Sequence, residues 1–137
     1  MKYVIRLLLA LLAVANAATA QTIHDHAPVN GLKTYYEIYG TLHGAGKPLV
    51  LLHGGGSTIA STFGRVLPEL AKTHQVIAVE LQAHGHTADI DRPLTFEQDA
   101  DDVTALLGRL HVARADSWVS VTGARLRCRS PSATPNW

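Results

Sequence analysis

The chain has 137 residues, enough for one domain, and 47% of them are hydrophobic, which excludes a chain that is disordered by composition. Charged residues make up 17%, and the formal net charge of +1 argues against a strongly basic nucleic-acid binder and against an acidic tail protein. A single cysteine excludes an internal disulfide framework and a cysteine-rich zinc module.

The charge changes sign along the chain and divides it into three segments. Residues 1–20 carry two basic residues and no acid, residues 21–117 carry seven basic and eleven acidic residues, and residues 118–137 carry three basic residues and no acid. We expect these segments to be a signal peptide, the N-terminal part of a folded domain, and a tail of different origin.

The first segment has the layout of a secretory signal peptide. Lys2 and Arg6 precede the unbroken apolar run Leu7–Ala15, and small residues follow it in two A-x-A arrangements. A helix of this run would span about 13 Å, against about 30 Å of hydrocarbon core, so we expect cleavage before Ala18 or Gln21. The sequence therefore predicts an exported protein, periplasmic or secreted, with no stable membrane anchor after cleavage.

Three parts of the middle segment have the composition of strands. Thr34–Tyr39 is rich in aromatic and β-branched residues and follows a tight turn at Asn30-Gly31. Leu49–Leu52 and Gln75–Val79 are short, continuous apolar runs. Such runs are typical of strands that are buried on both faces of a parallel sheet.

Two helices are expected between and after these strands. Helical spacing of apolar residues predicts one helix over 63–70, which Pro68 interrupts. A capping box, Thr95-x-x-Gln98, predicts the start of the other, whose apolar stripe comprises Phe96, Val103, Leu106, Leu107 and Leu110. This order of elements predicts an α/β fold with a partial, mainly parallel sheet flanked by helices.

The most distinctive motif, His53-Gly54-Gly55-Gly56-Ser57, follows the strand expected at 49–52. In open parallel sheets, ligands bind at the carboxyl ends of the strands. Consecutive glycines leave their N–H groups unshielded, and these groups can converge on an anion. The loop could be an oxyanion hole, a dinucleotide phosphate site, or a turn that only allows close packing. Glu80 would suit a ribose-binding acid, but Ile59 stands where G-x-G-x-x-G needs its last glycine.

Residues 48–56, with the sequence PLVLLHGGG, resemble the strand and oxyanion loop of the α/β-hydrolase superfamily. Residues 76–89 resemble the next strand and loop of that family, which usually ends in D-x-x-G-x-G-x-S. In this chain Glu80, Ala83 and Thr87 replace the aspartate, the first glycine and the serine of that pattern.

The resemblance covers residues 29–117 and implies an incomplete α/β-hydrolase fold. It also implies an esterase- or lipase-like serine hydrolase that acts on a small ester-like molecule and needs no cofactor. By family analogy, the oxyanion donor is the backbone N–H of Gly55, and His53, Gly54 and Gly56 are the other residues of the loop.

The chain has eight histidines, and two pairs invite a metal hypothesis. His84-x-His86 with Asp89 resembles the zinc pattern H-x-H-x-D-H, but its acid is one place late and no histidine follows. His24-x-His26 lies just after the expected cleavage site, where chains are usually mobile. We expect no metal site, and we expect His53 and His84 to brace their loops by hydrogen bonds.

The motif that would carry a nucleophile, G-x-S-x-G, does not occur in this sequence. The resemblance ends at Asp116-Ser117, where that elbow should follow. Ser120 has no glycine two places before or after it, so we interpret it as an ordinary strand or loop serine. No complete catalytic set is expected, because the elbow, the acid and the triad histidine are missing from the matching positions.

Residues 118–137 suggest a shifted reading frame. Trp118 is encoded by TGG and every valine codon begins with GT, so a one-base shift at Val119 forces a glycine codon, GGT. Allowed codons then continue to Gly-Phe-Ser-Asp-Gly-Gly and an amphipathic helix, with the nucleophile at the place of Val121. We therefore expect a single-nucleotide deletion near codon 118 and an inactive chain. A non-catalytic exported anion-binding module and a dinucleotide-binding fragment remain as alternatives.

Overall fold

The computed structural model describes residues 22–42 and 46–120. The signal peptide expected over 1–20 lies outside the described residues, and of the tail expected over 118–137 only residues 118–120 are described. Five strands form one sheet in the order β1-β2-β4-β3-β5. Their bounds are Ile23–Val29 for β1, Leu32–Tyr39 for β2, Leu49–Leu52 for β3, Val76–Val79 for β4 and Asp116–Val119 for β5.

The first two strands form an antiparallel hairpin, in which Val29 pairs with Leu32. The turn between them has φ of 48° at Asn30 and 82° at Gly31, and two positive φ angles are the requirement of a type I′ turn. The predicted strand at 34–39 and its Asn-Gly turn are confirmed, and the strand begins two residues earlier.

The expectation of a mobile segment around His24-x-His26 is wrong, because both histidines lie in β1. Alternate residues of this strand, Ala27 and Val29, are buried in the core, and every residue of β1 has a pairing partner in β2. Pairing with β2 and burial of one face therefore order a segment that begins close to the expected cleavage site.

The predicted strands at 49–52 and 75–79 are confirmed as β3 and β4. They pair in parallel, and β3 also pairs in parallel with β5. All four residues of β4 are buried, as expected for a strand covered on both faces. Since β2 joins β4 in antiparallel orientation, the sheet is mixed, with its parallel part in the later strands.

The single helix predicted over 63–70 is wrong. The structure has two short helices there, α2 at Ile59–Phe63 and α3 at Leu67–Leu70. Pro68 lies in the first turn of α3, where its missing N–H costs no hydrogen bond, but it would leave one unmade in a helix that continued from α2. The chain therefore ends one helix at Gly64 and starts another.

The last helix, α4, spans Phe96–Arg109. Thr95 caps it, since its Oγ1 accepts a hydrogen bond from the Gln98 N–H at 3.1 Å. Only this half of the predicted capping box forms, because the Gln98 side chain donates to Asp102 instead. The prediction that Phe96 belongs to the buried stripe is wrong, because its side chain is 56% exposed. The contacts of α4 with the core begin one turn later, at Ala100, and its buried apolar residues are Val103, Leu106 and Leu107.

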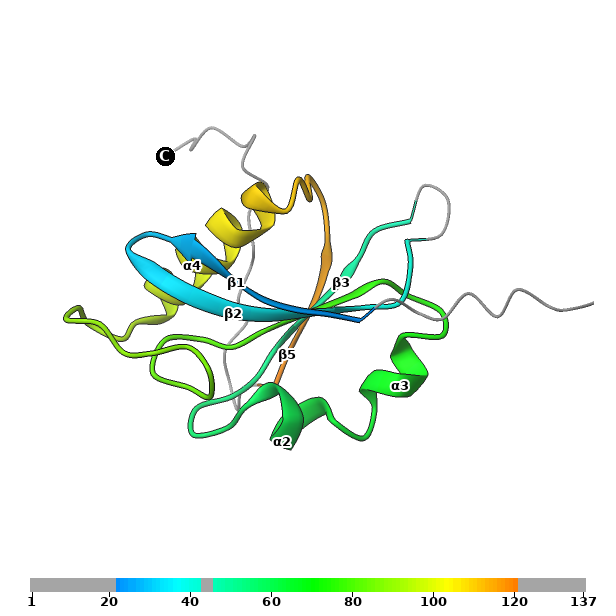
Figure 1. Cartoon of the computed structure of the whole chain (residues 1–137), viewed down its shortest axis with the longest axis horizontal. Helices are drawn as coiled ribbons and strands as arrows, with labels where there is room; N and C mark the ends of the chain where they lie inside the picture. The colour runs from blue at the N-terminus through cyan, green and yellow to red at the C-terminus, as the bar shows by residue number, and fades with distance from the viewer. Residues whose placement is uncertain (1–21, 43–45, 121–137) are drawn as a thin grey trace, which may run out of the picture.

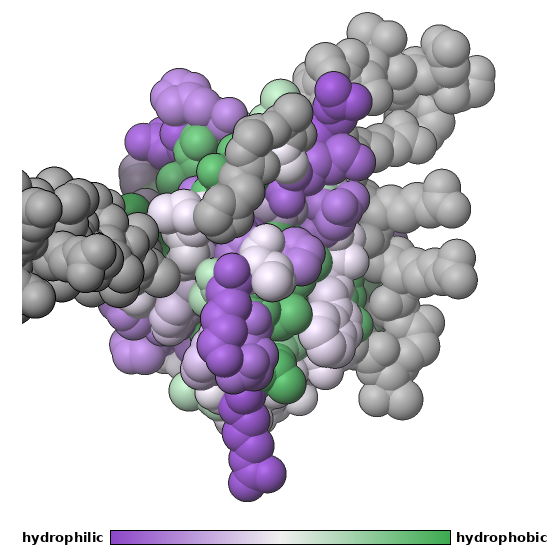
Figure 2. Space-filling view, turned by 90° about the vertical axis from the view of Figure 1, so that its right-hand side faces the viewer, coloured by the Kyte–Doolittle hydropathy of each residue, from purple (hydrophilic) through white to green (hydrophobic). Residues whose placement is uncertain are grey.

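Helices cover both faces of the sheet (Figure 1). The α4 side of the sheet contains the larger apolar cluster, and α2 and α3 cover the other face with a smaller one. Figure 2 shows the side of the molecule at the right of Figure 1, where apolar patches lie between polar side chains. Within residues 22–42 and 46–120, no helix is long and apolar enough to cross a membrane.

Candidate active-site loop

The glycine motif forms a tight turn directly after β3. The Ser57 N–H donates to the Gly54 carbonyl at 3.3 Å, and the Ser57 hydroxyl donates to the same oxygen at 2.7 Å. Gly56 has a φ of 71°, which the third position of a type II turn requires and which favours glycine. The backbone conformation of the turn therefore explains why position 56 is a glycine.

A second glycine is explained by close packing. An ideal Cβ atom on Gly54 would lie 2.5 Å from the carbonyl oxygen of Ser120. The Ser120 N–H in turn donates to the Leu52 carbonyl at 2.9 Å. The loop after β3 thus lies against the backbone that leaves β5, which is where a hydrolase places its elbow. Val121, the predicted place of the nucleophile in the shifted frame, lies outside the described residues.

The peptide unit between Gly54 and Gly55 has a defined direction. Its carbonyl accepts from the Ser57 hydroxyl and from Nδ1 of His53, the latter at 2.9 Å. Because a trans peptide is planar, with its C=O and N–H opposed, the Gly55 N–H points away from these partners. Gly55 is exposed, and its N–H has no hydrogen-bond partner among the described residues. Gly55 as oxyanion donor stays a prediction, but its N–H is available for that role.

His53 is fully buried and braces the loop, as predicted. Its Nε2 accepts the N–H of Leu81 at 3.1 Å, so Nδ1 must carry the proton that it donates to the Gly54 carbonyl. Burial is the largest influence on this side chain and lowers its pKa below the ordinary histidine value. His53 is therefore held as one neutral tautomer between two loops.

His84 makes a matching contact from the loop after β4. Its Nε2 accepts the Gly56 N–H at 3.0 Å, and its Nδ1 lies 2.7 Å from the Gln82 carbonyl. The rings of His53 and His84 lie with their centroids 4.8 Å apart. The predicted bracing role of His84 is confirmed, and the Gly56 N–H is already used within the protein.

Glu80 is buried at the end of β4 and joins three segments. Its carboxylate accepts the N–H of Ile59, the first residue of α2, at 3.3 Å. It also accepts the backbone N–H of His86 and lies 3.0 Å from His86 Nδ1. Both oxygens are used inside the protein, which argues against a role in binding a ribose.

Thr87, another departure from the family pattern in this loop, makes equivalent use of its hydroxyl. Its Oγ1 donates to the Glu80 carbonyl at 2.8 Å and accepts the Tyr35 N–H at 2.9 Å. The glutamate and the threonine therefore make bonds that hold the loop to β2, to α2 and to the loop's own backbone.

The metal hypothesis gains no support from the described residues, among which no group of three or more histidine, cysteine or acidic side chains could hold a metal ion. His86 is bound to Glu80, and Asp89 accepts from the Gln82 amide at 2.7 Å. The His84-x-His86 and Asp89 side chains therefore serve separate hydrogen bonds.

An ion pair between the partly buried Arg92 and the buried Asp102 was not predicted from the sequence. Asp102 on α4 is 3% exposed and also accepts from Asn30 at 2.8 Å and from Gln98 at 3.1 Å. This set ties the β1–β2 turn and the loop after β4 to α4. The sequence contained one signal for this pair, since Asp102 stands directly before Val103 of the apolar stripe. A carboxylate that is buried there is expected to be paired, because buried carboxylates are almost always paired.

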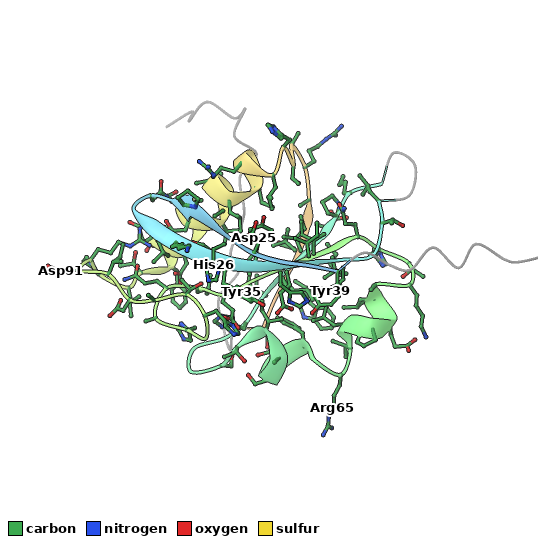
Figure 3. All side chains as sticks on the ribbon, viewed as in Figure 1. Asp25, His26, Tyr35, Tyr39, Arg65 and Asp91 are labelled. Carbon is green, nitrogen blue, oxygen red and sulfur yellow. The ribbon has the colours of Figure 1, made fainter. Side chains whose placement is uncertain are left out.

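A second polar cluster lies on the hairpin. Glu37 accepts hydrogen bonds from the hydroxyls of Tyr35 at 2.8 Å and Tyr39 at 2.5 Å. Burial, followed by the bond to Glu37, raises the pKa of Tyr35 to about 12. Figure 3 shows His26, Tyr35 and Tyr39 on the hairpin, whereas Arg65 points away from the body of the molecule. Because both tyrosine hydroxyls donate to Glu37, we interpret this cluster as part of the structure of the hairpin.

Solved structures of several hydrolases are similar to this chain. An enol-lactonase from Burkholderia xenovorans LB400 is 32% identical, covers 69% of this chain and 36% of its own, and has a TM-score of 0.60. The epoxide hydrolase CorEH is 30% identical, covers 74% and 32%, and has a TM-score of 0.59. An alpha/beta hydrolase fold protein from Burkholderia ambifaria is 22% identical and has a TM-score of 0.62. The match covers 73% of this chain and 36% of that protein, and at this identity the likeness is one of fold alone.

A scan against protein-family models and a search of curated proteins gave no match. The chain spans about a third of the length of these solved structures.

Proposed function

Since the described residues form a partial α/β-hydrolase fold, we propose that this chain is the N-terminal part of an exported serine hydrolase. The substrate class is a small ester or lactone. The chain as it stands is inactive, because its sequence contains no G-x-S-x-G elbow.

One observation carries the proposal. The Gly55 N–H is exposed and unpartnered among the described residues, and the loop that presents it packs against Ser120 at the end of β5. A free backbone donor next to the position of an elbow is what acyl transfer requires, because negative charge develops on the carbonyl oxygen of the substrate in the transition state.

The chemistry divides between this chain and the rest of the hydrolase. A serine hydroxyl attacks the carbonyl carbon of the ester, a histidine takes the hydroxyl proton, and the former carbonyl oxygen becomes an oxyanion. Gly55 would supply one N–H to that oxyanion, and the residue after the nucleophile would supply the other. The chain therefore holds half of an oxyanion hole.

The shifted reading frame is part of the proposal. A deleted nucleotide near codon 118 would explain why the resemblance stops at the elbow, and it would put the nucleophile at the place of Val121. Nucleotide sequencing through codons 118–137 tests this directly. Codons that cannot give Gly-Phe-Ser-Asp-Gly-Gly in the shifted frame would rule it out.

Activity is tested by comparing two proteins. The 137-residue chain and the product of the frame-restored gene, with its downstream sequence, are treated with a fluorophosphonate probe and with p-nitrophenyl esters. We expect labelling and turnover only in the restored protein, and loss of both when its serine at position 121 is changed to alanine. Turnover by the 137-residue chain that disappears in Ser120→Ala would instead identify Ser120 as a working nucleophile.

A further inference from the structure

We propose that His84 is a positioning residue that fixes the conformation of the glycine loop and leaves Gly55 as its donor. The inference rests on the proposed function, but its evidence is a contact within the protein. His84 Nε2 accepts the N–H of Gly56 at 3.0 Å, and nothing comparable holds the N–H of Gly55 among the described residues.

Two histidines hold two successive peptide units of the loop. His53 holds the unit between Gly54 and Gly55 through its carbonyl, and His84 holds the unit between Gly55 and Gly56 through its N–H. The second unit is the central peptide of the turn. In a turn with glycine at both central positions this peptide can flip, since no side chain opposes the change in φ and ψ. A flip would replace the Gly56 N–H by the Gly55 carbonyl in front of His84.

The chain holds His84 firmly enough for this role. Its backbone N–H donates to the Leu81 carbonyl at 3.1 Å, and its own carbonyl accepts the Thr87 N–H at 2.9 Å. Because Nε2 accepts from Gly56, Nδ1 carries the proton and donates it to the Gln82 carbonyl at 2.7 Å. The imidazole is thus fixed as one neutral tautomer, with its acceptor directed at the glycine loop.

This arrangement gives the N–H groups of Gly55 and Gly56, at the centre of the turn, different roles. The Gly56 N–H is held by the protein and is unavailable to a ligand. The Gly55 N–H projects from a peptide unit whose carbonyl is bound, and it remains exposed. Because His84 already holds the loop in one conformation, the loop loses less conformational entropy when an anion binds to the Gly55 N–H.

The test measures solvent exchange of the Gly55 and Gly56 amide protons by NMR in the full chain, each rate corrected for its intrinsic value. We expect Gly56 to exchange about fivefold more slowly than Gly55, as one net hydrogen bond predicts. His84→Ala removes this difference. His84→Gln restores it, because the glutamine side-chain oxygen is also an acceptor. His74→Ala, a matched change at an exposed histidine, leaves both rates unchanged.

Two results would overturn the inference. One is equal corrected exchange of Gly55 and Gly56 in the unchanged chain, and the other is protection of Gly56 that survives His84→Ala. Should His84→Ala fail to fold, the ring nitrogen shifts of unchanged His84 decide the question, since a protonated Nε2 contradicts the contact. Failure of the proposed hydrolase activity would leave all these measurements unaffected, so the two proposals fail separately.

Discussion

β4 and β5 are four-residue strands that flank β3 in parallel, yet their environments are opposite. All four residues of β4 are buried, whereas Asp116, Ser117 and Trp118 of β5 are exposed. β4 has β2 on its outer edge, and β5 has no second neighbour among the described residues. The composition follows the environment, VIAV against DSWV. The difference teaches that the sheet is filled in around β4, which we call its complete side, whereas β5 is an exposed edge within the described residues.

The largest effect is expected on the complete side, from Asp102→Ala. The change leaves the partly buried Arg92 guanidinium, whose side chain is 15% exposed, without its carboxylate, and removing one partner of a buried pair costs about 3–5 kcal/mol of unfolding free energy. Urea unfolding of the purified chain measures it. Asp101→Ala, an exposed neighbour on the same helix, is the control and should change stability by less than about 0.5 kcal/mol.

Truncation of a β3 core residue sharpens the comparison across the sheet. Leu51 is fully buried, so Leu51→Ala should lower the free energy of unfolding by about 2–5 kcal/mol. Trp118 pairs with Leu51 but is 47% exposed, so Trp118→Ala should cost clearly less despite the larger side chain. An equal or larger loss from Trp118→Ala, measured by the same unfolding transition, would show that β5 is covered in solution.

Gly54→Ala tests the contact between the two sides. A methyl group there must displace the Ser120 carbonyl, which we expect to cost about 1–3 kcal/mol and to weaken the pairing of β5 with β3. Hydrogen exchange of the Ser120 amide, which is bonded to Leu52, reports that pairing. Gly108→Ala is the matched control, since a Cβ there meets no atom within 4 Å. Unchanged exchange at Ser120 in Gly54→Ala would contradict the contact.

These outcomes bear on what the sequence could predict. Apolar runs predicted β3 and β4, and an Asn-Gly pair predicted the hairpin turn, because burial and positive φ impose strict residue choices. β1 was not predicted, since its exposed face carries His24 and His26 and it contains Pro28, which an edge strand tolerates. The braces His53 and His84 were predicted, but their partners were not, because each bond joins loops that lie 28 residues apart in the chain.

The glycine loop should differ from the rest of the complete side in how its contribution to the free energy of unfolding depends on pH. The pKa of His53 is lower in the folded chain than in the unfolded chain, so the unfolded state binds the proton first as the pH falls. Stability is therefore fully present above about pH 6.5 and is lost as the pH falls toward the folded pKa. Urea midpoints at pH 5 and pH 7.5 measure this loss. His53→Asn should reduce the slope, and an unchanged slope would assign the loss to another group.

The smallest change in stability is expected at the open edge. Ser117 is exposed on β5, so Ser117→Lys should alter the free energy of unfolding by no more than about 0.5 kcal/mol. Unpaired strand edges favour association between chains, and a charge opposes it, so the variant should contain more monomer in analytical ultracentrifugation. We expect the unchanged chain to be marginally stable and prone to aggregate. A soluble monomer of residues 21–137 with one sharp thermal transition would contradict that expectation.

The register of the sheet also has a consequence for the order in which the strands assemble. The hairpin joins Val29 to Leu32, whereas the β3–β5 pairing joins Leu49 to Asp116. A hairpin of this kind closes in about 1–10 μs, and closing the longer loop carries a larger entropic cost before any contact compensates for it. β5 should therefore join last, after the hairpin, β3 and β4 have collapsed together. The glycine loop, which packs against the end of β5, would acquire its final neighbour only at that step, so the donor site is among the latest features to mature during folding.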